Sequence, residues 1–257
     1  MRENPWHQPA PHSEHEQRFR NLISLHGLTA SWLRDLDLDA AGTAHLLKRV
    51  AAPEVRSHLR KLEQITRGSA GNGAGSAPRL ADLIDASTPD EFLRSFEYAV
   101  WALQAWTLRN VLDRTSPGEL PALRSLIEQS SWKEGRSASA LRWPSMPVEA
   151  ASDARGLLAA LRDSPLAGYP EGRALLTRRC TASGADLELL ACPHVSPFPE
   201  VKAVQDDLCA SHAAWMRGFL YGLNPSMVLE HLPKRRGVAR CAVKFGFHSH
   251  SLRSSFL

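Results

Sequence analysis

Long apolar runs are absent from this 257-residue sequence. No stretch approaches the roughly 18 consecutive apolar residues that a membrane-spanning helix needs. Residues 1–20 are polar and rich in proline and histidine, and they lack the apolar centre of a secretory signal peptide. These two absences predict a cytoplasmic protein that has no membrane partner.

Cysteine is scarce and confined to one end of the chain. The four cysteines are Cys180, Cys192, Cys209 and Cys241, so the first 179 residues contain none. Without a secretory signal, we expect free thiols rather than a disulfide framework. No Cys-x-x-Cys pair is present, which leaves the spacing irregular for a zinc site.

The net charge of the chain is also small. The formal net charge is +4, and Lys234, Arg235 and Arg236 form the only tight basic cluster. A run of three is typical of a solvated turn, so we expect no nucleic-acid partner. Apolar residues make up 43% and charged residues 23%, which are ordinary values for a globular protein with a real core.

The hydrophobic pattern divides the chain into three parts. Residues 1–17 are predicted to be disordered, 18–130 to form a helical domain, and 131–257 to form an α+β domain with hydrolase-like features. In the helical part, apolar spacing predicts helices from Arg18, over 43–67, and from Pro89, where Thr88 and Glu91 can form a capping box. Residues 68–78 read as a flexible linker. Another helix should start near Ser116 and fade near Ser130.

The second half should contain short strands and a long helix. We expect a helix over 153–162, a hairpin over 174–181 and 186–192, a helix over 199–222, and strands over 227–231 and 238–247. The last strand alternates apolar and largely polar residues, as a half-buried antiparallel strand does. The predicted class is α+β, with a helical N-terminal half and a small antiparallel sheet plus one long helix in the C-terminal half.

The residues able to carry chemistry gather in this C-terminal half. Cys192 and His194 follow a predicted strand, Cys209 and His212 lie on the long helix, and Cys241 lies on the last strand. Cys209 and His212 are three positions apart, so they share one helix face. His212 falls beside a gap in the apolar stripe and should lie at least partly inside.

Three interpretations of these residues stay open. Thiolates and imidazoles can hold zinc tetrahedrally. A thiol can act as a nucleophile when a nearby histidine accepts its proton, with Cys209 and His212, or Cys192 and His194, as the pair. Cysteines can also be small buried core residues beside ordinarily hydrogen-bonded histidines. The motifs Gly-x-Ser-x-Gly, His-Glu-x-x-His and Gly-x-Gly-x-x-Gly are absent.

A set of spaced motifs resembles a known family. The pattern comprises Cys192-Pro193, Glu200, Leu208-Cys209, Leu223-Asn224-Pro225, and Cys241 with Phe245. Over residues 186–247, about a quarter of the chain, it resembles the C-terminal region of the L-2-amino-thiazoline-4-carboxylic acid hydrolase family. Arg240 stands where that pattern has an acidic residue.

The resemblance implies hydrolysis of a C–N bond in a cyclic amidine, a thiazoline or an amide, in natural-product metabolism. It carries over Cys192, Cys209 and Cys241 as candidate site residues, with Glu200 as an acid/base or structural partner. Together with the thiol–imidazole pairs above, the catalytic candidates are Cys209, His212, Cys192, His194 and Glu200, and the candidate binding residues are Trp215, Asn224 and Cys241. We expect no metal and no cofactor. The partner would be a small-molecule or peptide substrate, together with a second copy of the chain or a partner enzyme.

Two other functions remain as alternatives. A hydrolase-like domain without catalysis can bind a peptide as an added strand, as an accessory protein of ribosomal-peptide biosynthesis would. A ligand sensor is the third hypothesis, although no output domain accompanies it. A catalyst needs Cys and His close together in a concave site, whereas a peptide binder needs an open sheet edge or a groove.

Overall fold

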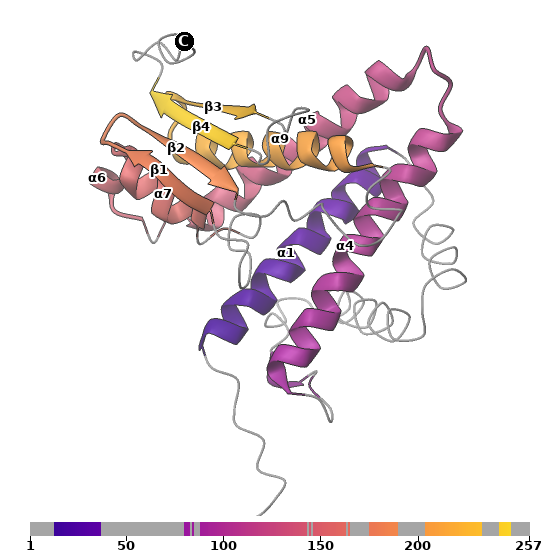
Figure 1. Cartoon of the computed structure of the whole chain (residues 1–257), viewed down its shortest axis with the longest axis horizontal. Coiled ribbons are helices and arrows are strands. Elements are labelled where there is room, and N and C mark those ends of the chain that lie inside the picture. The colour runs from indigo at the N-terminus through magenta and orange to yellow at the C-terminus, as the bar shows by residue number, and fades with distance from the viewer. Residues whose placement is uncertain are drawn as a thin grey trace, which may run out of the picture.

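Figure 1 shows the computed structural model of the chain. The structure describes residues 13–36, 80–82, 84, 88–142, 144, 146–162, 164, 175–189, 204–232 and 242–247. The helix expected over 43–67 and the linker at 68–78 lie outside these residues. So do the expected strand residues 190–192 and 238–241.

The described part of the chain has an α+β fold, as predicted. Its helices are α1 (Ser13–Asp35), the single turn η1 (Leu80–Asp82), α4 (Pro89–Arg114), α5 (Leu120–Arg142), α6 (Val148–Ala151), α7 (Ala154–Arg162) and α9 (Gln205–Leu223). Its strands are β1 (Leu175–Cys180), β2 (Gly184–Leu189), β3 (Met227–Leu232) and β4 (Ala242–Phe247). They form one antiparallel sheet in the order β1-β2-β4-β3.

The sheet and the helices share one hydrophobic core. Leu187 on β2, Leu229 on β3, and Val243 and Phe245 on β4 are buried on the sheet face that α7 and α9 cover. The alternation predicted for the last strand is therefore confirmed at its described end. Figure 1 shows α1 and α4 side by side, extending away from the sheet, with α9 running beside it.

α1 begins earlier than its apolar spacing indicated. The helix starts at Ser13, before the expected start at Arg18, so residues 13–17 are helical rather than disordered. Glu16 Oε1 accepts a hydrogen bond from the backbone N–H of Leu80 over 3.1 Å, and His15 Nε2 lies 3.4 Å from Asp90 Oδ1 on α4. These contacts fix a polar first turn that hydrophobic periodicity does not detect.

The start of α4 agrees with the predicted capping box. The Thr88 side chain accepts from the backbone N–H of Glu91, and the Glu91 side chain accepts from the backbone N–H of Thr88. The backbone hydrogen bond from Thr88, and then the one from its hydroxyl, lower the pKa of Glu91. The helix that follows is buried through Phe92, Phe96 and Val100, as expected of a central helix.

Thr88→Ala is expected to destabilise the protein by about 1 kcal/mol, because the first turn of α4 loses its cap. The lowered pKa of Glu91 means that its contribution is present above its unfolded-state pKa and is lost as pH falls through the folded value. The difference between variant and wild type should therefore shrink in acid. Urea unfolding at pH 7 and at pH 3 measures both effects, and an equal difference at the two pH values would contradict the reciprocal cap.

The predicted end of α5 near Ser130 is wrong. The helix runs without a break to Arg142 and packs along α9. Ser130, Ser131, Gly135 and Ser139 are buried on it. Small residues and a glycine indicate a helix end when a sequence is considered alone. In this position they instead let two helix backbones approach closely.

The β1–β2 turn begins one position earlier than predicted and is one residue shorter. It spans Thr181 to Ser183, and β2 starts at Gly184 rather than at Asp186. The hydroxyl of Thr181 accepts from the backbone N–H of Gly184 over 3.2 Å, and the backbone N–H of Thr181 donates to the Gly184 carbonyl. A side chain therefore closes the turn, which moves the register toward the N-terminus.

Candidate functional site

α9 places two polar side chains in the core. The predicted stripe is confirmed where it is described, since Val204, Leu208, Trp215 and Phe219 are all buried. Ser211 and His212 lie inside as well, and Ser211 Oγ donates to the Leu208 carbonyl of the same helix over 2.9 Å. Because a buried hydroxyl and imidazole must find partners, this stretch of α9 organises the residues around it.

His212 is held on two sides by α4. Its side chain is only 3% exposed, and its Nε2 lies 3.2 Å from Oε1 of Gln104. The imidazole ring also packs against the indole of Trp101, with centroids 5.2 Å apart and an angle of 55° between the planes. One helix thus supplies both a hydrogen-bond partner and an aromatic wall, and these restrict rotation of the imidazole.

Gln104 extends the contact to a third helix. It is fully buried, and its Nε2 donates to the backbone carbonyl of Leu25 on α1 over 3.0 Å. Imidazole, amide and carbonyl therefore form a continuous line from α9 through α4 to α1. α1 and α4 belong to the helical N-terminal half and α9 to the C-terminal half, so both halves contribute to these contacts. The family resemblance covers residues 186–247 only and therefore did not point to Gln104 or Leu25.

Cys209 lies one turn before His212 on the same face of α9. It is a thiol rather than half of a disulfide, and the residue is 8% exposed. The structure therefore buries both the thiol and the imidazole on one helix, and the expected burial of His212 is confirmed. Such a pair can transfer a proton from sulfur to nitrogen when their rotamers bring them together.

The other candidates are placed as follows. Cys192, His194, Glu200 and Cys241 lie outside the described residues. Trp215 packs inside the core, stacked on Phe219 with ring centroids 5.2 Å apart. Asn224 ends α9, where its Nδ2 donates to the Ala151 carbonyl over 2.8 Å and its Oδ1 accepts from the Ser226 N–H. Asn224 thus joins α9 to α6.

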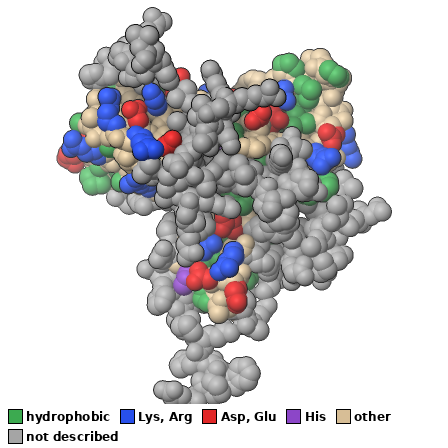
Figure 2. Space-filling model, in the orientation of Figure 1, with side chains coloured by type: hydrophobic (Ala, Val, Ile, Leu, Met, Phe, Trp, Pro, Cys, Tyr) green, Lys and Arg blue, Asp and Glu red, His purple; other side chains and the backbone are tan. Residues whose placement is uncertain are grey.

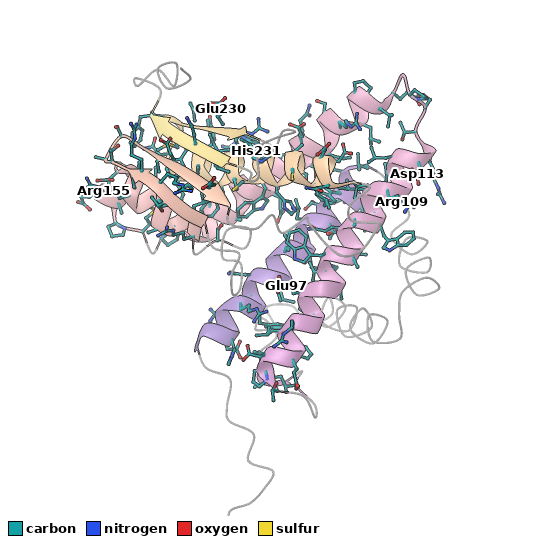
Figure 3. The ribbon with its side chains drawn as sticks, viewed as in Figure 1. Glu97, Arg109, Asp113, Arg155, Glu230 and His231 are labelled. Carbon is teal, nitrogen blue, oxygen red and sulfur yellow. The ribbon has the colours of Figure 1, made fainter. Side chains whose placement is uncertain are left out.

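Asp207 in the first turn of α9 and Glu97 on α4 are both in ion pairs. Asp207 accepts a hydrogen bond from Arg124 Nε over 2.7 Å, and this bond, followed by the charge of Asp207, raises the pKa of Arg124. Away from α9, Arg18 Nη2 on α1 donates to Glu97 Oε2 on α4 over 3.1 Å. Figure 3 labels Glu97 on α4. Within the described ranges, no three His, Cys, Asp or Glu residues gather as a metal site.

Gln104 is the site residue that the sequence did not reveal. It stands between Leu103 and Ala105 on a helix that is apolar around much of its circumference. A single amide in such a helix has to find a buried partner, because an unsatisfied amide is costly. The presence of one amide among apolar residues was the available signal that Gln104 has a buried partner. The sequence could not identify that partner, because His212 lies 108 residues away.

Comparisons with known proteins add no relative. No protein-family model matches the chain, and searches of curated proteins and of solved structures found no similar protein. Among the helices in the described ranges, none is both long enough and apolar enough to cross a membrane.

Proposed function

We propose that this chain is a cytoplasmic, thiol-dependent hydrolase of specialised metabolism that cleaves a C–N bond in a small cyclic amidine, thiazoline or amide. Cys209 is the nucleophile and His212 the proton acceptor. The observation that carries the proposal is the buried pair on α9, in which Gln104 holds the imidazole one turn from the thiol. The resemblance around Cys192, Glu200 and Cys209 supports the same reaction class.

The proposed hydrolysis proceeds in two steps, formation of a covalent intermediate on Cys209 and its hydrolysis. The Cys209 thiol transfers its proton to His212, and the thiolate adds to the carbon of the C–N bond. The nitrogen leaves with the proton that His212 returns, and a thioester or thioimidate remains on Cys209. Water, deprotonated by His212, then attacks that carbon, and the thiol is regenerated as the product departs.

The burial of the pair favours a small substrate. Cys209 exposes only 8% of its side chain, so a folded protein surface cannot bring a peptide bond against the sulfur. A low-dielectric site also strengthens the attraction between thiolate and imidazolium. These two features suit a compact ring or amide that replaces water around the sulfur.

Cys209→Ser is expected to reduce turnover by about 1000-fold or more, because removing a covalent nucleophile removes most of the chemistry. The full chain would be assayed against a panel of 2-aminothiazolines, cyclic amidines and small amides by mass spectrometry. Cys180→Ser is the matched control, since Cys180 is a free, half-buried thiol on β1. Equal turnover by wild type and Cys209→Ser, with unchanged circular dichroism, would exclude Cys209 as nucleophile.

A peptide-binding accessory role is the second candidate, and the sheet topology favours it. The order β1-β2-β4-β3 leaves β1 and β3 as the outer strands within the described sheet. The outward face of the sheet is charged, with Arg179 paired to Asp186 and Asp186 opposite Lys244. Figure 2 shows basic and acidic side chains exposed in the region of the sheet. An added peptide strand would bind equally to wild type and Cys209→Ser, and neither protein would turn it over.

A further inference from the structure

We infer that Gln104 is a positioning residue that fixes neutral His212 as its Nε2–H tautomer, which makes Nδ1 the atom that receives the Cys209 proton. The tautomer follows from hydrogen bonding alone. The catalytic consequence rests on the proposed function. Gln104 itself touches neither the substrate nor the thiol in this scheme, so it acts through the imidazole.

The orientation of the Gln104 amide is set by Leu25. A backbone carbonyl can only accept, so the group 3.0 Å from the Leu25 oxygen has to be the Gln104 NH₂. The Gln104 carbonyl oxygen then faces His212 at 3.2 Å. An amide oxygen also only accepts, so Nε2 of His212 has to carry the hydrogen.

The reverse orientation would place like groups together. If the amide flipped, its oxygen would face the Leu25 carbonyl, and two buried acceptors would meet without a donor. Gln104 is fully buried, so bulk water is not at hand to relieve this mismatch. Leaving a buried polar group unsatisfied costs about 1–3 kcal/mol, which is enough to keep one orientation dominant.

The fixed tautomer defines the direction of proton transfer. With the hydrogen on Nε2, the lone pair of the neutral ring is on Nδ1, and that atom is the base. When Nδ1 takes the thiol proton, the Nε2–H bond to Gln104 is kept, so the ring stays in place throughout the step. The packing of Trp101 against the ring opposes the rotation that would exchange the two nitrogens.

The same contacts give α1 a role in the site. The Leu25 carbonyl orients the amide, the amide orients the imidazole, and the imidazole serves the thiol on α9. The helical N-terminal half therefore helps to orient the imidazole, because the Leu25 carbonyl can only accept a hydrogen bond and so fixes which end of the amide faces it. Without the Leu25 carbonyl on α1, the Gln104 amide would be free to flip.

The experiment is long-range ¹H–¹⁵N NMR on the imidazole nitrogens of the full-length protein, above the pH at which His212 is protonated. His212→Gln identifies the His212 signals among those of the 11 histidines. We expect a protonated Nε2 and an unprotonated Nδ1 in wild type. Gln104→Met removes both polar atoms and should give a tautomer mixture. Gln104→Glu keeps an acceptor toward Nε2 and should keep the Nε2–H form, in a less stable protein because its second oxygen faces the Leu25 carbonyl.

Activity separates this inference from the proposed function. On a substrate that wild type hydrolyses, Gln104→Met should lower kcat about 10- to 100-fold with little change in KM, as loss of an outer hydrogen-bond partner does, and Gln104→Glu should recover part of it. An Nδ1–H tautomer in wild type overturns the inference whatever the activity. An Nε2–H tautomer that depends on Gln104, in a protein that hydrolyses nothing, supports the positioning role and overturns the hydrolase proposal.

Discussion

Gly218→Ala is expected to destabilise the protein by about 3 kcal/mol, the upper end of the usual cost of overpacking. A Cβ added at Gly218 on α9 would lie 2.0 Å from the carbonyl oxygen of Trp132 on α5. A Cβ added at Gly135 on α5 would lie 2.0 Å from the carbonyl oxygen of Trp215 on α9. These are backbone atoms, so no side-chain rotation relieves the clash, and the two helices have to separate.

Separating the helices would disturb contacts along the whole interface between α5 and α9. Arg124 meets Asp207 near the start of both helices, and Ser139 meets the position of Gly222 near the end of both, so α5 and α9 run parallel. Alanine would otherwise gain roughly 0.5–1 kcal/mol over glycine in a helix. A net loss therefore means that packing outweighs helix propensity at this position.

Gly118→Ala is the matched control, because an added Cβ there meets nothing within 4 Å. It is expected to change the free energy of unfolding by no more than about 0.5 kcal/mol. Urea unfolding compares both variants and the Gly135→Ala/Gly218→Ala double variant. The double variant should lose less than the sum of the single losses, since both substitutions force the same movement. An unchanged urea midpoint for Gly218→Ala would show that α5 and α9 are not closely packed at this position.

The interface between α5 and α9 also shows which parts of the fold the sequence predicts and which it does not. The capping box of Thr88 and Glu91 and the apolar stripe of α9 depend on neighbours within one or two turns, and both were predicted. The continuation of α5 past Ser130 depends on α9, which lies some 80 residues later in the chain. Ser131 and Gly135 are poor helix formers, so only the partner helix makes them favourable there.

The candidate site was predictable to a similar extent. Cys209 and His212 are close in sequence, so their shared helix face followed from helical spacing, and the burial of His212 followed from the apolar stripe. Gln104 and the Leu25 carbonyl could not be found in that way. Their contacts join α1, α4 and α9, and no local pattern reports which buried amide meets which imidazole.

Trp32→Ala is expected to destabilise the protein by about 3–5 kcal/mol, the range for truncating a buried aromatic side chain. Trp32 on α1 is fully buried, and its Nε1 donates to Ser131 Oγ on α5 over 2.8 Å. Ser131 Oγ in turn donates to the Ile127 carbonyl over 2.8 Å. Alanine at position 32 would leave a large cavity and remove the polar contact between α1 and α5.

Two milder variants separate these contributions. Trp32→Phe retains most of the apolar volume and removes the donor, whereas Ser131→Ala leaves the indole N–H without its acceptor and should cost about 1–3 kcal/mol. If the hydrogen bond matters, the double variant should lose clearly less than the two single losses combined in urea unfolding. Strict additivity would show that Trp32 contributes by packing alone.

Trp32 also bears on the site, because it fixes the register of the helix that carries Leu25. If α1 orients the Gln104 amide, Trp32→Phe should alter the His212 nitrogen signals through α1 and Gln104. Signals identical to wild type in a measurably destabilised variant would show that the amide keeps its orientation independently of how α1 is anchored. The helical half would then support the fold without tuning the imidazole.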